Sequence, residues 1–203
     1  MADEDGKMRI RKISKTVGLI SKLRHSIPRH ILLYIYQTLI HPHLNYGLAA
    51  WGQASKTSLN KILILQKKVF RMMYFTDIRE HAIPLLIDAD ILPVSFMYYK
   101  TVANLMHVIN NNNSPTNLLN LFEKTSTIHS YYTRSSSSGN FHVKSSKLSR
   151  FGVKLWNEMP CHIRDLPKKK FRKVIHRLLS DILKREDDYI ETPLIVEKVR
   201  LIV

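Results

Sequence analysis

The 203-residue sequence is poor in features that mark several classes of protein. It contains one cysteine, Cys161, which excludes an internal disulfide and a Cys-rich zinc site and favours a reducing compartment. Its most lipid-like stretch, residues 31–40, is far shorter than the roughly 20 apolar residues that cross a bilayer. The first thirty residues lack the apolar block and cleavage site of a secretory signal. We therefore expect an intracellular protein, nuclear or cytoplasmic, that is neither secreted nor inserted in a membrane.

Acidic residues are also scarce, and their distribution is uneven. From Gly6 to Thr76 there are thirteen Lys or Arg and no Asp or Glu, and from Thr125 to Arg185 there are fourteen basic and three acidic residues. Residues 186–203 reverse the sign, with two basic and five acidic residues. A formal net charge of +16 attracts polyanions over long range, so nucleic acid is the first candidate partner.

Apolar residues recur every three or four positions along most of the chain, which predicts amphipathic helices and a mainly α fold. We expect a helical bundle with an irregular Ser/Thr-rich loop region and a C-terminal amphipathic helix. The predicted helices cover residues 8–24, 28–42, about fifteen residues that begin at the Ser and Thr caps of the SKTSLN segment, 93–109, and a stretch after Pro167. The second helix should end or kink at Pro42, because proline has no N–H to donate. The last helix should bury one face, made of Phe171, Val174, Ile175, Leu178 and Ile182.

These elements suggest an order of regions along the chain. The predicted regions are a disordered segment over 1–7, a helical domain over 8–110, a loop-rich linker over 111–150, a basic helical region over 151–185 and an acidic tail over 186–203.

The segment LIHPHLNYGLAAWG, residues 39–52, has the residue types of a metal or catalytic site. His41 and His43 could offer two ligands, but Pro42 lies between them and no Cys, Asp or Glu occurs within thirty residues. We favour a structural role, in which His41 caps the second helix and Tyr46 and Trp51 pack beneath the following turn.

Two other pairs of residues have the residue types of a catalytic site, but a structural role explains each of them more simply. Asp88 and Asp90 could hold the metal ions of a polymerase, although a polar turn between two apolar stretches accounts for them more simply. Cys161 and His162 could form a nucleophile and its base, but adjacent residues rarely turn their side chains toward each other.

Several blocks, in the same order, resemble the region downstream of the polymerase core in LINE-type, or non-LTR, retrotransposon reverse transcriptases of the jockey-like kind. The similarity covers roughly residues 11–184 and begins with ISKTVGLISKLRHSIPRHILLYIYQTLIHPHLNYGLAAWG, followed by LQKKVFRMMY. A His-x-Tyr-x-Thr-Arg stretch ends in Arg134, and a Gly-x-x-x-Trp-Asn-x-x-Pro block runs from Gly152 to Pro160.

This resemblance implies the thumb and C-terminal region of an RNA-directed DNA polymerase, without the palm. In such enzymes the palm holds two Mg²⁺ ions on paired aspartates, and no block of that type occurs here, so we expect no cofactor and no catalysis from this chain alone. The expected partners are a template–primer duplex of RNA and DNA and the missing palm. The expected phosphate contacts are Lys61, Lys67, Lys68, Arg71, Arg134, Lys168, Lys169, Lys170 and Arg172.

Two alternatives remain beside this hypothesis. The chain could be a polymerase in its own right that uses Asp88 and Asp90. It could also be a co-opted helical interaction protein that binds acidic partners, or a relic without a selected activity.

Overall fold

The computed structural model describes residues 2–52, 56–111, 114–128, 139–142 and 147–185. These residues form two compact units. The first unit comprises the chain up to Tyr98, together with residues 183–185, and the second comprises the described residues of Tyr99–Ile182. The boundary falls inside a helix, whereas the sequence suggested one helical domain over 8–110. The predicted mainly α class is confirmed, because helices dominate both units and the described strands are two residues long each.

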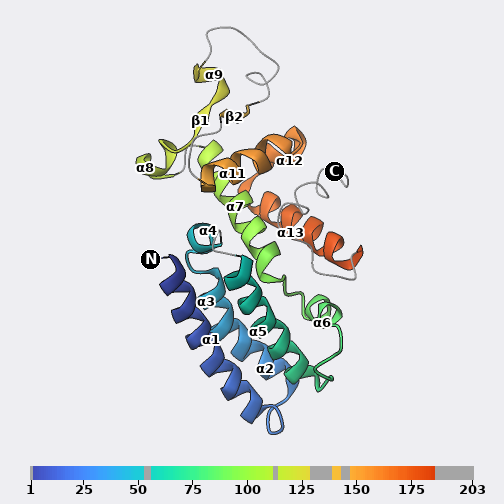
Figure 1. The fold of residues 1–203 in the computed structure, drawn as a ribbon. Helices are drawn as coiled ribbons and strands as arrows, with labels where there is room; N and C mark the ends of the chain where they lie inside the picture. Colours follow the sequence, from blue (N-terminus) through green and yellow to red (C-terminus); the bar gives the residue numbers. More distant parts are fainter. Residues whose placement is uncertain (1, 53–55, 112–113, 129–138, 143–146, 186–203) are drawn as a thin grey trace. The chain divides into compact units, whose positions relative to one another are not determined.

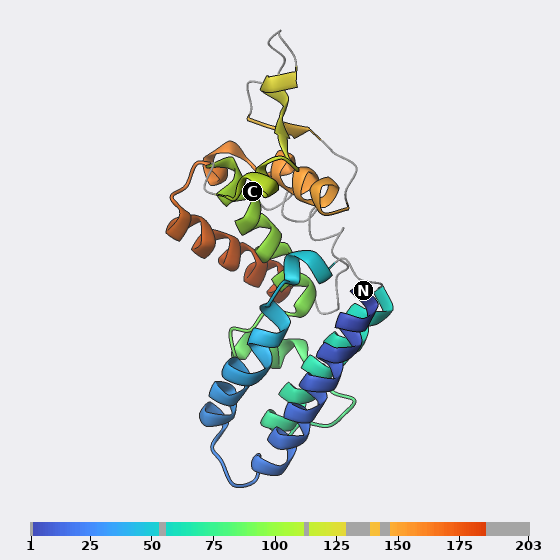
Figure 2. The same ribbon diagram turned by 90° about the vertical axis from the view of Figure 1, so that its left-hand side faces the viewer.

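The first unit is a helical bundle (Figures 1 and 2). Its helices are α1 (Ala2–Leu23), α2 (Arg29–Ile35), a π-helical turn (Tyr36–Ile40), α3 (His41–Asn45), α4 (Leu48–Trp51), α5 (Lys56–Tyr74), α6 (Ile83–Asp88) and the start of α7 (Val94–Asn110). α1 and α5 lie side by side and run in the same direction, since Arg24 after α1 lies over the ring of Phe75 after α5. Their inner faces meet those of α2 and the π-helical turn.

The core of the first unit is made of one apolar face from each of its longer helical segments, although Ile31 and Leu39, which the apolar periodicity of the second helix also placed in that face, are exposed. The buried residues of α1, α2, the π-helical turn and α5 include Ile13, Val17, Ile20, Leu32, Tyr36, Ile40, Ile62, Leu63, Val69, Phe70 and Met73. The rings of Tyr36 and Phe70 meet edge to face with centroids 4.9 Å apart. This contact joins the π-helical turn to α5.

The second predicted helix does not end at Pro42. The chain passes from α2 through the π-helical turn, in which the His41 N–H donates to the carbonyl of Tyr36, five residues earlier. The helix then continues as α3, with Pro42 in its first turn and its end at Asn45. The predicted end at Pro42 was wrong, because a proline in the first turn of a helical segment lacks an N–H that no hydrogen bond within the helix would use. The α-helical bonding pattern is nevertheless interrupted directly before this proline, by the π-helical turn.

Residues 2–7 were expected to be disordered, and this was also wrong, because α1 begins at Ala2. No proline precedes Pro28, so nothing in the covalent chain breaks the helical hydrogen-bond ladder before α1 ends at Leu23.

A buried amide fixes the start of α7 against α5. Gln66 is 1% exposed, and its Nε2 donates to the Tyr36 hydroxyl and to the Leu92 carbonyl, both at 3.0 Å. Its Oε1 accepts the Val94 N–H at 3.0 Å. Val94 opens α7, where backbone N–H groups have no partner within the helix, so Gln66 acts as a cap supplied by a different helix. Burial raises the pKa of Tyr36 well above its ordinary value, which keeps this hydroxyl neutral.

The second unit contains the rest of α7 and a set of shorter elements. These are α8 (Thr116–Leu119), β1 (Glu123–Lys124), α9 (Thr125–Ile128), β2 (Phe141–His142), α11 (Lys147–Glu158), α12 (Cys161–Arg164) and α13 (Lys168–Arg185). β1 and β2 pair antiparallel, with Lys124 opposite Phe141. Where the sequence predicted a loop-rich linker over 111–150, the described residues form short helices and a small sheet joined by turns.

The Gly-x-x-x-Trp-Asn block has a packing explanation in the second unit. A Cβ atom on Gly152 would lie 2.9 Å from the Met106 Sδ, so glycine lets α11 approach α7 closely. Trp156 is buried, and its ring lies near those of His107, Phe141 and Phe171. Asn157 bonds both backbone groups of Phe141, accepting its N–H at 3.0 Å and donating to its carbonyl at 2.9 Å. The block thus holds β2 and α7 to α11.

The buried face of α13 is rotated around the helix from the predicted one. Phe171, Ile175 and Ile182 are buried as expected, but Leu179 is also buried, while Val174 and Leu178 are only half-buried. At 3.6 residues per turn, residues 175 and 179 lie on one side of Phe171 and residues 174 and 178 on the other, so the buried face is turned toward the first pair.

Candidate nucleic-acid interface

The lysines of α5 include two that are exposed to solvent. Lys61 and Lys68 are exposed and lie seven residues apart, which places them two turns apart on one face of α5. Ile64 lies between them on the same face and is 57% exposed. This face therefore presents two charges separated by an apolar surface.

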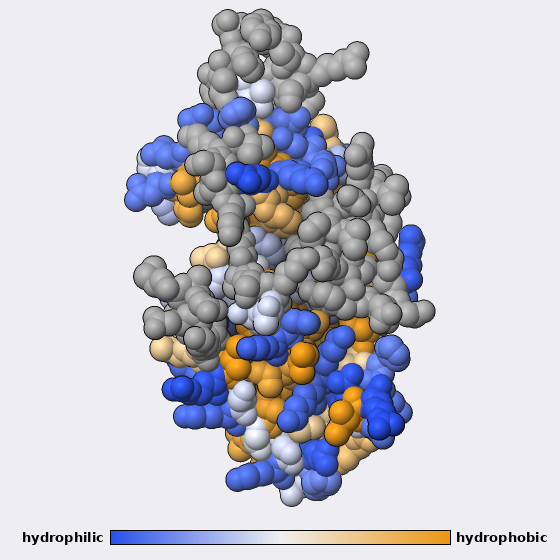
Figure 3. Space-filling model, in the orientation of Figure 1, coloured by the Kyte–Doolittle hydropathy of each residue, from blue (hydrophilic) through white to orange (hydrophobic). Residues whose placement is uncertain are grey.

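α1 adds basic residues that were not among the expected contacts. Arg11, Lys12, Lys15 and Lys22 are all exposed along this helix, which packs beside α5. The sequence carried the signal, since these residues fill the positions that the apolar stripe leaves open. Figure 3 shows hydrophobic side chains interspersed among hydrophilic ones on the displayed face of the first unit.

The basic first turn of α13 is the second group of candidate contacts. Lys168, Lys169, Lys170 and Arg172 are exposed, while Phe171 among them is fully buried and anchors the turn. No acidic residue occurs in this first turn. Cations at a helix N-terminus oppose the helix dipole, so these side chains cost the helix stability while they strengthen the positive potential that attracts phosphate.

Three of the expected phosphate contacts are not among the exposed residues that the structure describes. Lys67 and Arg71 are half-buried, so they lie beside the exposed face of α5 and not on it. The Arg71 Nε donates to the Glu80 carbonyl at 2.7 Å, which ties α5 to the segment before α6. Arg134 lies outside the described residues.

The LIHPHLNYGLAAWG segment builds a turn at the end of α3. Gly47 has φ of +63°, a conformation that costs glycine little, and the Trp51 Nε1 donates to the Tyr46 carbonyl at 2.9 Å. Trp51 is buried as expected, but Tyr46 is 79% exposed, so the expectation that it packs beneath the turn was wrong. The reason is that the bond to Trp51 uses the backbone of Tyr46 and leaves its ring outside the core. His41 directly follows the π-helical turn, where its N–H donates to the Tyr36 carbonyl, and it begins α3, which ends at Asn45.

Arg9 of α1 joins this turn to the bundle. Its Nη1 donates to the His43 carbonyl at 2.9 Å, and its guanidinium carbon lies 5.1 Å from the centroid of the Trp51 ring and 5.8 Å from that of Tyr46. Both distances are within the range of a cation–π interaction. Sequence reasoning missed this residue, because nothing in the spacing of Arg9 and Tyr46 indicates that they meet.

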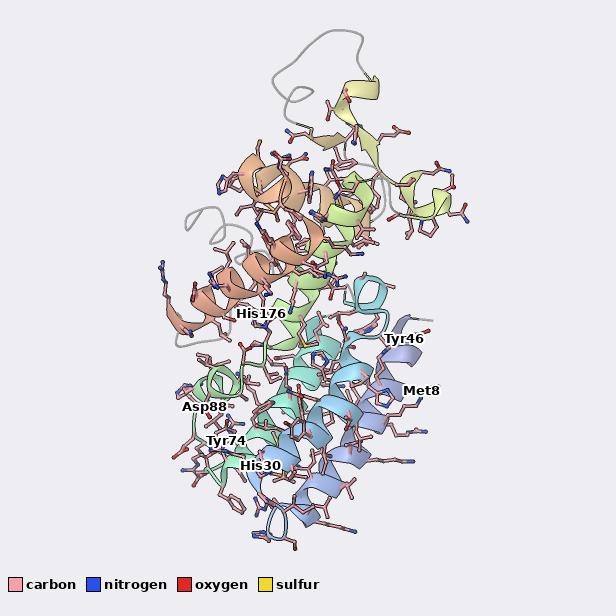
Figure 4. All side chains as sticks on the ribbon, turned by 180° about the vertical axis from the view of Figure 1, so that it is seen from behind. Met8, His30, Tyr46, Tyr74, Asp88 and His176 are labelled. Carbon is pink, nitrogen blue, oxygen red and sulfur yellow. The ribbon has the colours of Figure 1, made fainter. Side chains whose placement is uncertain are left out.

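The paired aspartates form the predicted polar turn. Asp88 ends α6 and its Oδ2 accepts a hydrogen bond from the Tyr74 hydroxyl at 2.6 Å (Figure 4). Desolvation and this carboxylate raise the pKa of Tyr74 to about 12, although Arg29, whose guanidinium lies 4.6 Å from the ring centroid, acts in the opposite direction. Asp90 follows with φ of +52°, as a turn requires. Across the described ranges no group of three or more His, Cys, Asp or Glu residues is placed to hold a metal ion.

Cys161 and His162 are both exposed at the start of α12. The thiol sulfur lies 3.6 Å from Nη2 of Arg164, the nearby guanidinium on the same short helix.

Within the part of the chain that is described, none of the helices has the length and apolar character needed to span a membrane.

Comparison with known proteins does not assign the chain to a family. No protein-family model, curated protein or solved structure matches the chain.

Proposed function

We propose that this chain binds nucleic acid through its phosphate backbone, without reading base sequence, as the thumb region of a LINE-type reverse transcriptase does. The proposed substrate is a template–primer duplex of RNA and DNA. In this proposal the chain supplies grip and not catalysis, and the parent polymerase's palm would supply the Mg²⁺ site.

The observation that carries the proposal is the basic surface that α5 and the part of α1 after Asp5 present within an acid-free stretch of sequence. No Asp or Glu occurs between Gly6 and Thr76, and the exposed cations of this stretch include Arg11, Lys12, Lys15, Lys61 and Lys68. A surface of this kind repels itself in the absence of a counterion, and a phosphate backbone removes that repulsion. The basic first turn of α13 supports the same partner, since its four cations oppose the helix dipole.

Backbone contact fits these side chains better than base readout. Lysine presents a flexible point charge, whereas base edges are read by bidentate groups such as Arg, Asn or Gln held in a groove. A hybrid of RNA and DNA is close to A-form, and its deep major groove is closed to side chains. Lysines on two neighbouring helices therefore suit phosphates and not bases.

The test is the salt dependence of binding to a labelled RNA–DNA hybrid, measured by fluorescence anisotropy from about 50 to 300 mM salt. Each phosphate contact releases counterions, so the log of the association constant should fall by about 0.7 to 0.9 per contact for each unit of log salt. Replacing Lys61 and Lys68 together with glutamine should lower the affinity equally for hybrids of different sequence. It should also reduce the slope by about 1.4 to 1.8, the share of two contacts.

Lys154→Gln is the matched control, because Lys154 is exposed on α11 and lies outside the expected contacts. It should leave the slope unchanged. Undetectable or salt-independent binding by the wild type would overturn the proposal, and full binding by the Lys61→Gln, Lys68→Gln variant would favour a protein partner instead.

A further inference from the structure

The most exposed ring of the LIHPHLNYGLAAWG segment has no role in the phosphate grip proposed above. Tyr46 ends α3 with 79% of its surface in solvent, although its backbone is fixed on both sides. Its N–H donates to the Pro42 carbonyl at 2.9 Å, and its own carbonyl accepts the Trp51 Nε1. An aromatic side chain of this size in solvent, on a backbone held this firmly, is suited to contact a partner.

The turn keeps the base of the tyrosine side chain in one place. Gly47 adopts φ of +63°, and Gly52 allows close packing, since a Cβ there would clash with the ring of Tyr98. Trp51 is thereby buried next to the Arg9 guanidinium. Gly47 and Trp51 thus fix the backbone at Tyr46.

Arg9 holds one charge close to both rings. Its guanidinium carbon lies 5.8 Å from the centroid of Tyr46 and 5.1 Å from that of Trp51, and the carbonyl of His43 fixes its Nη1. Tyr46 therefore has a cation on one side while most of its surface faces water. Little conformational freedom would be lost when a second flat group stacks on the ring.

The surroundings select a nucleobase over other flat groups. Met8, 57% exposed, widens the apolar surface at this end of the first unit, where Figure 4 labels both Met8 and Tyr46. Lys12 is exposed one turn along α1 from Arg9, on the same side of the helix. Aromatic rings that stack on bases, combined with cations that follow the backbone, are the usual means of binding unpaired strands.

We propose that Tyr46 stacks on an unpaired base of a single-stranded nucleic acid, so that the first unit binds single strands as well as duplex backbone. This inference rests on the proposed nucleic-acid function and adds to it a site for the unpaired part of the substrate. Single-stranded template beside a primer end is a substrate that presents both features.

The test compares three labelled oligonucleotides of about 12 nucleotides, titrated with the full chain. They are a single-stranded RNA, a single strand of the same length and charge without bases, and an RNA–DNA hybrid. Tyr46→Ala should weaken binding to the single-stranded RNA by about 5- to 150-fold, the effect of losing one stacked base. It should leave binding to the abasic strand and to the hybrid unchanged.

Two variants separate stacking from other effects. Tyr46→Phe should bind the single strand as the wild type does, because stacking needs the ring and not the hydroxyl. Tyr34→Ala is the matched control, since Tyr34 is also exposed, at 62%, on α2 of the same unit, and it should change nothing. Because Tyr46 lies outside the core, circular dichroism should show the same helix content in all three variants.

The outcomes distinguish this inference from the proposed function. Unchanged single-strand binding by Tyr46→Ala, with hybrid binding intact, would overturn the stacking site alone. Equal losses in Tyr46→Phe and Tyr46→Ala would overturn stacking in favour of a hydroxyl contact. Displacement of the RNA by poly-glutamate as readily as by unlabelled RNA of the same sequence would overturn it in favour of an acidic protein partner. Failure of the wild type to bind any of the three oligonucleotides would overturn the proposed function as well.

Discussion

Replacement of the buried amide Gln66 with leucine is the sharpest test of how the first unit is held together. The substitution keeps a side chain of similar length but removes every hydrogen bond that the amide makes. The Val94 N–H and the Leu92 carbonyl would then be left without a partner among buried side chains, since Leu92 is 6% and Val94 1% exposed.

The size of the effect follows from these bonds. An unpaired polar group in a protein interior costs about 1 to 3 kcal/mol, so the two backbone groups together cost about 2 to 6 kcal/mol. The Tyr36 hydroxyl, which is also buried, loses its bond to Gln66 and adds to this cost. Burial of the additional apolar surface of leucine offsets roughly 1 kcal/mol. We expect Gln66→Leu to lower the free energy of unfolding by roughly 3 kcal/mol.

Tyr36→Phe gives a second, milder measurement of the same network. It removes one hydroxyl and should cost about 1 kcal/mol, because the Gln66 Nε2 keeps its bond to the Leu92 carbonyl. In the Gln66→Leu background the same change should cost little, which gives a coupling energy of about 1 kcal/mol in the double-mutant cycle.

The assay is urea unfolding followed by far-ultraviolet circular dichroism, with Gln37→Leu as the control. Gln37 is exposed in the π-helical turn, and its replacement should change the unfolding free energy by no more than about 0.5 kcal/mol. If Gln66→Leu is no more destabilising than Gln37→Leu, or if the coupling with Tyr36 is zero, Gln66 does not cap α7 in the way described.

The two remaining predictions concern glycine positions and alkaline pH. Gly18→Ala should raise the free energy of unfolding by about 0.5 to 1 kcal/mol, because a Cβ there meets nothing within 4 Å. Gly52→Ala should lower the free energy of unfolding by about 2 kcal/mol, because its Cβ would lie 2.6 Å from the Leu48 carbonyl oxygen. Urea unfolding of both variants measures whether the two changes have these opposite signs. The pKa of Tyr74 is raised from 10.0 to about 12, so the folded state holds that proton more tightly; the resulting stabilisation is complete below pH 10 and is lost as pH rises to about 12. Tyr74→Phe should therefore show a smaller fall in stability over this range than the wild type, and an identical fall would contradict the assignment.

The sequence predicted the helices well because amphipathic periodicity is a local property. The stripe through Phe96, Val102 and Met106 is buried as predicted, in a helix whose bounds, Val94–Asn110, differ by one residue from those expected. Boundaries set by hydrogen bonding at a distance were predicted less well. Pro42 lies within a continuing helical path because the π-helical turn before it shifts the bonding by one residue, and no local propensity encodes that shift.

The candidate interface divides in the same way. The sequence alone determined that the chain is strongly basic and that Gly6–Thr76 contains no Asp or Glu, because the number of charged residues does not depend on the fold. Which cations project was decided by helix packing, since Lys61 and Lys68 are exposed while Lys67 and Arg71 are half-buried.

Contacts between residues far apart in the chain were decided by the tertiary structure alone. The bonds of Gln66 to residues 26 to 30 positions away, and the approach of Arg9 to Tyr46 and Trp51, depend on how α1, α3 and α5 pack. A sequence states which side chains can form such contacts, but only the close packing of helices brings a guanidinium or an amide within reach of one partner among many.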